Sequence, residues 1–134
     1  TSQVASLDDA TLRDLAAWFA SLPPTSPASA AARSAVSERG VVLYRDGDPS
    51  MGIPPCQGCH GAHGDGHAWA APDAGSRTYP MLRGQHADYV AQRLKDFRDG
   101  KHLSSSSDRV MAPVARTLDD DAIKAVAAWI ESGP

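Results

Sequence analysis

Apolar side chains recur with helical spacing in four segments of the chain. Within each segment they lie three or four positions apart, as on one face of an amphipathic helix. The segments are residues 7–19, 29–44, 86–98 and 118–130. No stretch of strand length alternates apolar and polar residues. The pattern therefore predicts an all-α fold.

Glycines, prolines and hydroxyl residues mark the expected ends of these helices and the loops between them. Gly100 suits the end of the third helix, and Thr117 suits the start of the last. Gly40 lies inside the second segment, where glycine costs about 1 kcal/mol relative to alanine. This cost favours a packing role, in which another helix approaches closely at Gly40. Residues 61–80 and the serines at 104–107 are expected to form loops.

The first and last helical segments resemble each other. Residues 7–19 and 118–130 align without a gap, from a shared Leu-Asp-Asp start to an Ala-Ala-Trp near the end. A hydroxyl residue, Ser6 or Thr117, stands three positions before an aspartate in each copy, as in a capping box. Two unrelated amphipathic helices are the alternative, but the shared start and end favour a repeat.

The repeat predicts a domain organisation. We expect residues 1–24 to be the C-terminal helix of a preceding, similar domain and the start of a proline-rich linker. Residues 25–28 complete the linker, and residues 29–134 form the domain itself. The first helix then has an apolar face that served the other domain: Leu12, Leu15, Trp18 and Phe19. Residues 1–20 are therefore expected to pack on another domain or chain, or on this domain's own surface. An apolar side open to solvent, or a helix closed over the haem as part of this core, would contradict the idea of an orphaned helix.

Cys56, Cys59 and His60 form the C-x-x-C-H motif of covalent c-type haem attachment. Each thiol adds to one vinyl group of the haem, and the histidine that follows offers an imidazole nitrogen to the iron. The chain has two cysteines, so the motif uses both. We therefore expect one covalent haem c, with His60 as an iron ligand.

Two other uses of the cysteines require features that the sequence does not predict. A thioredoxin-like redox pair needs the cysteines on a strand-to-helix turn. A zinc site could combine the two cysteines with His63 and His67, but zinc sites usually take two ligand pairs separated by a longer loop. Haem attachment is therefore the preferred interpretation.

Composition narrows the class of protein further. The 134 residues suffice for one domain with an appendage, and the net charge of −3 gives no indication of nucleic-acid binding. No apolar run approaches the length of a membrane span, and no signal peptide is present. Since haem attachment to this motif normally takes place outside the cytoplasm, we expect a periplasmic or otherwise extracytoplasmic protein whose signal peptide has been removed.

With these residues in place, the chain resembles a known family. The residues that carry the resemblance, besides Gly40 and the haem motif, are Tyr79-Pro80-Met81-Leu82-Arg83-Gly84-Gln85, Tyr89, Leu94, Phe97, Gly100 and Met111. They resemble a class I c-type cytochrome, most closely the C-terminal domain of a periplasmic diheme, tandem-domain cytochrome c. The resemblance covers about residues 30–132. It implies helices wrapped around one haem c, with the first and last crossing where Gly40 and Tyr44 meet Trp129.

The second axial ligand is a methionine if the resemblance holds. Three methionines compete, and Met51 lies too close to the haem motif to reach the opposite face of the ring. From the residues alone Met81 stays open. The resemblance implies Met111, on a loop before the C-terminal helix. A histidine ligand from His63 or His67 would need too short a path around the ring.

The resemblance also implies contacts around the haem. An iron-bound imidazole usually donates its other N–H to a carbonyl, and here Pro80 is the implied acceptor. Gln85 and Tyr89 are candidate donors to the haem propionates, with Arg77 and Arg83 nearby in the sequence.

Two functional classes follow. An electron carrier with His60 and Met111 on the iron would exchange single electrons with a membrane oxidase, a reductase or a dehydrogenase, without being an enzyme itself. The alternative is an open-site haem protein, either peroxidase-like or gas-sensing, which needs a vacant ligand position and a distal acid–base group.

Overall fold

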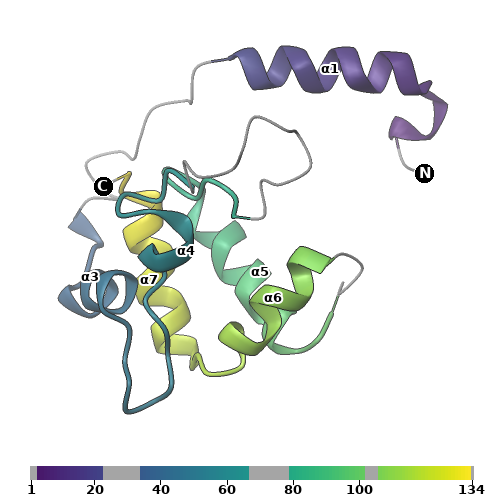
Figure 1. Cartoon of the computed structure of the whole chain (residues 1–134). Coiled ribbons are helices and arrows are strands. Elements are labelled where there is room, and N and C mark those ends of the chain that lie inside the picture. The colour runs from purple at the N-terminus through teal and green to yellow at the C-terminus, as the bar shows by residue number, and fades with distance from the viewer. Residues whose placement is uncertain (1–2, 23–33, 67–78, 102–105, 134) are drawn as a thin grey trace.

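The computed structural model describes residues 3–22, 34–66, 79–101 and 106–133, which form helices joined by turns and loops (Figure 1). The elements are η1 (Gln3–Ser6), α1 (Asp9–Ser21), α3 (Glu38–Arg45), α4 (Gln57–His60), α5 (Ala87–Arg98), α6 (Ser106–Ala115) and α7 (Asp120–Glu131). Pairing of extended backbone in these ranges is limited to one isolated bridge, between Asp48 and Ile53. The all-α prediction is therefore confirmed. None of the described helices is both long and apolar enough to cross a membrane.

Helix α7 forms the centre of the core. It packs against α3 and α5, and α5 packs in turn against α6 (Figure 1). The buried side of α7 carries six residues, which are Ala122, Ile123, Val126, Ala127, Trp129 and Ile130. Their three- and four-residue spacing is the apolar stripe that the sequence predicts for this segment.

The crossing of α3 and α7 depends on a glycine and an aromatic pair. A side-chain carbon on Gly40 would collide with the backbone carbonyl of Ala125, so the helices approach this closely only with glycine. One turn further along α3, the Tyr44 ring stacks on Trp129 with centroids 3.7 Å apart and planes 26° apart. The predicted contact of Tyr44 with Trp129 is therefore confirmed, whereas Gly40 meets Ala125 of the same helix and not Trp129.

The predicted helix before the haem motif is interrupted. It was expected without a break over residues 29–44, but Ser34 is helical, residues 35–37 are not, and α3 begins at Glu38. Residues 29–33 lie outside the described ranges. Ser37 ends the preceding non-helical stretch, since its side chain accepts a hydrogen bond from the Gly40 amide and so caps α3.

The caps of the repeated helices also differ from the prediction. Asp8, not Ser6, caps α1 by accepting from the Thr11 amide at 2.8 Å. Asp119, not Thr117, caps α7 by accepting from the Ala122 amide at 2.6 Å. The Thr117 hydroxyl instead donates to the Val114 carbonyl at the end of α6. Aspartate is favoured because its carboxylate accepts the free amide of the first turn and its charge complements the helix dipole.

Helix α6 replaces a predicted loop. Residues 104–107 and Met111 were expected in loops, but α6 spans Ser106–Ala115 and includes Met111. Pro113 lies inside this helix, where it cannot donate a hydrogen bond to the preceding turn. The helix forms nevertheless because Ala112 and Ala115 are buried, so tertiary packing offsets the loss.

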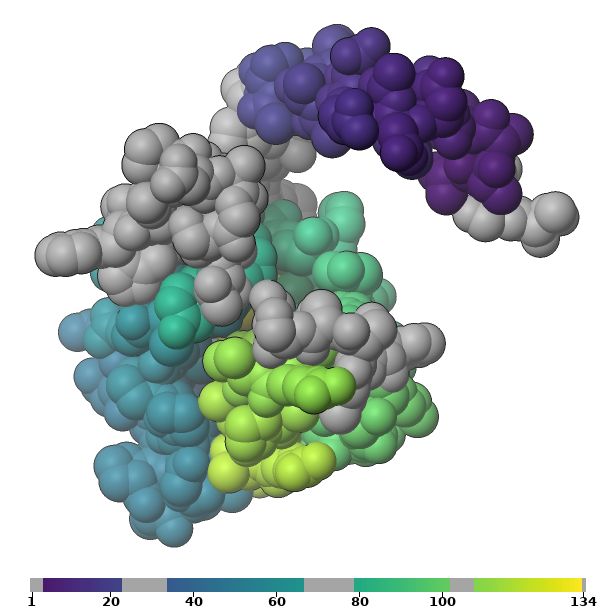
Figure 2. All heavy atoms as spheres, turned by 45° about the vertical axis from the view of Figure 1, so that its right-hand side comes forward, coloured from purple at the N-terminus to yellow at the C-terminus, as the bar shows by residue number. Residues whose placement is uncertain are grey.

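Helix α1 contacts none of the other described helices and stands apart from them in both views (Figures 1 and 2). It has no buried residue, and the side chains of its predicted apolar face are between 39% and 63% exposed. The expected packing on the domain's own surface is therefore wrong, and the exposed apolar side is the outcome said above to contradict an orphaned helix; packing on another domain or chain stays a prediction.

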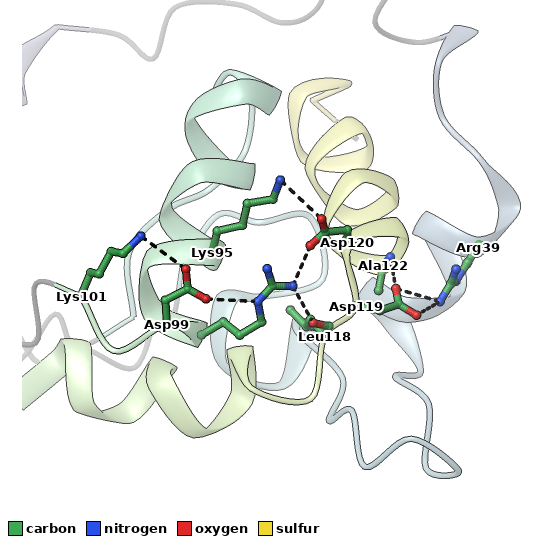
Figure 3. Close-up of polar contacts among 9 residues, drawn as sticks. Arg39, Lys95, Asp99, Lys101, Leu118, Asp119, Asp120 and Ala122 are labelled. Carbon is green, nitrogen blue, oxygen red and sulfur yellow. Dashed lines mark hydrogen bonds and ion pairs between the residues drawn. The ribbon is translucent and has the colours of Figure 1, made fainter.

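Ion pairs join the three core helices at the beginning of α7 (Figure 3). Arg98 of α5 donates to Asp120 at 2.7 Å and to the Leu118 carbonyl at 3.2 Å. Arg39 of α3 lies 3.3 Å from Asp119, and Lys95 lies 3.8 Å from Asp120. Ion pairs this exposed contribute little individually to the stability of the fold, and here they hold the ends of these helices together at the beginning of α7.

Candidate haem site

The site begins at the short helix α4, which presents His60. The His60 amide donates to the Cys56 carbonyl at 2.9 Å, so one helical turn places the cysteine and the histidine on neighbouring positions. On the imidazole, Nδ1 lies 2.9 Å from the Pro80 carbonyl oxygen. Donation from Nδ1 to that carbonyl fixes the ring orientation.

The second imidazole nitrogen of His60 has the properties of a metal ligand. Nε2 is buried and has no hydrogen-bond partner within the described ranges. Burial lowers the pKa of the imidazole, and the hydrogen bond to Pro80 opposes this shift only in part. The ring is therefore neutral, with the proton on Nδ1 and a lone pair on Nε2. A buried lone pair without a donor is what an axial haem ligand requires.

Backbone hydrogen bonds hold the Pro80 segment against the histidine. The Gly64 carbonyl accepts from the amides of Leu82 at 2.7 Å and Arg83 at 3.0 Å. The Gly66 amide donates to the His60 carbonyl at 2.8 Å. Gly66 has a φ of +78°, and a side-chain carbon there would lie 3.0 Å from the Tyr79 carbonyl oxygen. Glycine is needed at this close approach of two backbone segments.

Tyr44 adds a side-chain anchor behind the haem motif. Its ring is fully buried and its hydroxyl donates to the Gly61 carbonyl at 2.8 Å. Burial raises the pKa of this phenol, which therefore remains a neutral donor. The α3–α7 crossing and the residue next to His60 are thus joined by one side chain.

A cavity of about 310 Å³ lies beside His60. Five parts of the chain line it, and most of the lining is apolar: Cys56, His60, Pro80, Met81, Leu82, Gln85, Tyr89, Val90, Arg93, Leu94, Phe97, Asp108, Met111, Val126 and Ile130. A mostly apolar hollow with a few polar groups is typical of a cofactor site.

The structure brings together all but one of the residues proposed for the site from sequence. Cys56, His60, Pro80, Gln85, Tyr89 and Met111 line the same cavity, as does the rival ligand Met81. Cys59 is exposed and is not part of this lining. The two cysteines form no disulfide with each other, so both sulfurs are available for haem attachment. Of the two methionines, Met111 is half-buried and Met81 is 51% exposed.

Other candidates from the sequence lie elsewhere. His63 is exposed and does not line the cavity. Arg83 pairs with Asp65 at 3.4 Å, also outside the lining. His67 and Arg77 are outside the described residues. Within the described ranges no three histidine, cysteine or acidic side chains gather as a metal cluster, so the zinc hypothesis gains no support.

Sequence reasoning missed two charged residues of the lining, Arg93 and Asp108. Arg93 could have been found, because it lies one helical turn after Tyr89 on the same face of α5. Asp108 could not, because it belongs to α6, which was expected as a loop.

Fold and site together define a helical domain that attaches a haem covalently. Comparison with known proteins gives the same answer, since the family model for cytochrome c matches residues 37–134. The chain belongs to the cytochrome c family. It carries one covalent haem c at the motif that contains Cys56, Cys59 and His60.

Relatives of known structure or curated sequence extend beyond the single domain. The chain is 38% identical to cytochrome c4 of Azotobacter vinelandii over 98% of its own length and 58% of the relative. It superposes on reduced recombinant cytochrome c4 from Pseudomonas stutzeri with a TM-score of 0.76 and 32% identity, covering 98% of this chain and 64% of that one. It is also 35% identical, over 71% of its length and 39% of the relative, to a thiosulfate dehydrogenase electron acceptor from Stutzerimonas stutzeri. The chain thus spans less than two thirds of these relatives, and the resemblance to class I cytochromes c is confirmed.

Proposed function

We propose that the chain transfers single electrons through a haem c whose iron is held between His60 and Met111. The observation that carries the proposal is the buried, unpartnered Nε2 of His60 beside a cavity that Met111 also lines. When bound, the haem supplies a centre that alternates between two oxidation states one electron apart. A soft thioether ligand opposite a histidine favours the reduced state and closes both axial positions.

The arrangement of the helices favours Met111 over Met81 as the second ligand. Met81 follows Pro80, whose carbonyl already holds Nδ1 of His60, so it is attached to the histidine side of the site. Met111 comes from α6, which packs on α5, at a different part of the cavity lining. A second ligand would have to come from a part of the lining away from the His60 segment, and α6 would supply it through Met111.

The protein's own residues then keep the site rigid and dry. Pro80 and Tyr44 fix the imidazole and its neighbouring backbone, at 2.9 Å and 2.8 Å respectively. Leu94, Val126 and Ile130 form the apolar inner wall and exclude water. Little rearrangement of the histidine accompanies electron transfer when the imidazole is held in this way.

Addition of carbon monoxide to the reduced holoprotein tests the ligand assignment. A six-coordinate iron held by Met111 should leave the absorption spectrum of the wild type unchanged. Met111→Ala should open the position and form the carbon monoxide complex, while Met81→Ala should behave as the wild type. A complex in Met81→Ala alone would move the assignment to Met81. A complex in the wild type would favour an open-site haem protein, either peroxidase-like or gas-sensing.

We further propose that the protein is an electron carrier, not a catalyst, in the periplasm or another extracytoplasmic space. The relative named as an electron acceptor of thiosulfate dehydrogenase supports a dehydrogenase as one class of partner. Membrane oxidases and reductases are the other classes that would exchange electrons with it.

The repeated helix supports a preceding haem domain. Helices α1 and α7 share their Asp cap, and the four predicted apolar-face positions of α1 correspond to Ile123, Val126, Trp129 and Ile130. Those positions are at most 5% exposed in α7 and at least 39% exposed in α1. We propose that residues 1–24 end a second cytochrome domain, that residues 25–28 belong to the linker, which lies outside the described residues, and that residues 29–134 form the present one.

A further inference from the structure

One face of α5 forms a wall of the haem cavity. Five of its residues line the cavity, at spacings of three and four that place them in one stripe: Tyr89, Val90, Arg93, Leu94 and Phe97. Arg93 is the permanent cation of the described lining. A guanidinium in a mostly apolar wall needs an explanation, because unpaired charge is costly to remove from water.

Neighbouring side chains hold the Arg93 guanidinium at the rim of the cavity. Its central carbon lies 4.9 Å from the centroid of the Phe97 ring, in a cation–π contact. One terminal nitrogen lies 3.5 Å from Asp96, which is buried and also accepts from Gln92 at 2.9 Å. The Arg93 side chain is 30% exposed, so it lies between the cavity and solvent.

These contacts leave most of the hydrogen-bonding capacity of Arg93 unused. A guanidinium has five N–H donors, and the bond to Asp96 is longer than the ~2.7–2.9 Å of a close charge-assisted pair. The geometry therefore holds the group in place and still offers a planar pair of donors. Such a fork matches a carboxylate, which it can bind through two parallel hydrogen bonds.

The haem itself brings the matching groups. A haem c carries two propionate carboxylates, and an apolar cavity cannot accept them without a partner or access to water. We propose that Arg93 pairs with a haem propionate at the rim of the cavity and raises the reduction potential of the iron. The inference rests on the proposed function, since it requires the haem to lie between His60 and Met111.

The direction of the effect follows from charge. A free propionate favours the ferric state, which has one more positive charge than the ferrous state. The guanidinium offsets the carboxylate and removes part of that preference. Among the described residues, Asp96 of α5 lies 3.5 Å from Arg93 and Asp108 of α6 lines the same cavity, and the negative charge of each reduces the effect of Arg93 on the iron.

Voltammetry of the holoprotein tests the proposal at one pH. Arg93→Gln should lower the reduction potential, and Arg93→Lys should restore most of the loss because it keeps the charge. Lys95→Gln is the matched control. It removes the same charge from the same helix, but Lys95 pairs with Asp120 and does not line the cavity. An unchanged potential in a folded Arg93→Gln protein, or an equal fall in Lys95→Gln, would overturn the assignment.

A second measurement does not depend on a folded variant. In the reduced wild-type holoprotein, NMR should show nuclear Overhauser effects between the Arg93 guanidinium protons and the propionate methylene protons. Their absence, in a spectrum that resolves the Arg93 protons, would contradict the pairing. Carbon monoxide binding by the same wild-type sample would contradict the axial ligands instead, so failure of the two proposals is distinguishable.

Discussion

Asp119 connects two helices through a single carboxylate. It caps α7 through the Ala122 amide and lies 3.3 Å from Arg39 of α3. The hydrogen bond from Ala122 is the main cause that lowers the pKa of Asp119, with Arg39 acting in the same direction. Asp120 has its pKa lowered chiefly by the hydrogen bond from Arg98. Both residues thus make the junction of α3, α5 and α7 dependent on pH.

The acid stability of the protein should reflect these lowered pKa values. A carboxylate with a lower pKa in the folded state stabilises the fold above its unfolded pKa, about 3.9 for aspartate. That contribution is lost as the pH falls through the folded pKa. We therefore expect the Tm of the holoprotein to decrease when the pH is lowered below about 4.

Asp119→Asn should make this fall shallower and lower the Tm at neutral pH, because asparagine keeps the cap but not the charge. The Tm measured between pH 7 and pH 3 checks both effects. Asp121→Asn, on the same exposed turn, is the control. If the Tm of Asp119→Asn decreases between pH 4 and pH 3 as much as that of the wild type, this carboxylate does not control the acid stability.

The chemistry of single residues was predictable where covalent bonding dictates the spacing. Cys56, Cys59 and His60 could be assigned because haem attachment requires that order. Arg93 was missed although it lies one helical turn after Tyr89, whereas Asp108 could not be assigned because its helix was not predicted. From the residues alone the choice between Met81 and Met111 stayed open, and both line the cavity.

At the scale of elements, the helices that carry a clear apolar stripe were predicted best. The segments 86–98 and 118–130 agree with α5 and α7 within about two residues. Helix α6 was missed because its serines and Pro113 are typical of loops, whereas buried Ala112 and Ala115 stabilise it. In this segment the local propensity favours a loop and the tertiary packing favours a helix, and only the propensity can be judged from the sequence.

Gly40→Ala tests how closely α3 and α7 must approach. The added methyl would meet the Ala125 carbonyl, so the helices must separate, and overpacking of this kind costs ~1–3 kcal/mol. Urea denaturation of the holoprotein should show that loss in the free energy of unfolding. Gly58→Ala is the control, because a side-chain carbon there meets no atom within 4 Å. Equal stability of the two variants would mean that the crossing adjusts without cost.

At the scale of the whole molecule, α1 is the element that the rest of the fold does not account for. Its apolar face is exposed, and the helix stands apart from the body that contains α3, α5, α6 and α7 (Figure 2). An isolated helix of 13 residues is marginal in water. The proposed preceding domain would supply the missing partner surface.

Hydrogen exchange tests that role of α1. In the 134-residue chain the amides of α1 should exchange much faster than those of α7. In a longer protein that includes the proposed domain, both helices should be protected to a similar degree, and the iron content should be at least two per chain. Rapid exchange of α1 in both proteins, or one iron per chain, would contradict the tandem organisation.

The two sides of the haem cavity are anchored unequally. The segment that holds His60 is tied to α7 by the hydrogen bond from the Gly84 amide to the Ile130 carbonyl, and to α3 through Tyr44. Helix α6, which carries Met111, packs on α5 among the described helices. Helix α6 can thus unfold locally and open one side of the cavity while the crossing of α3 and α7 stays folded. The cavity has one fixed wall and one wall that can be released separately.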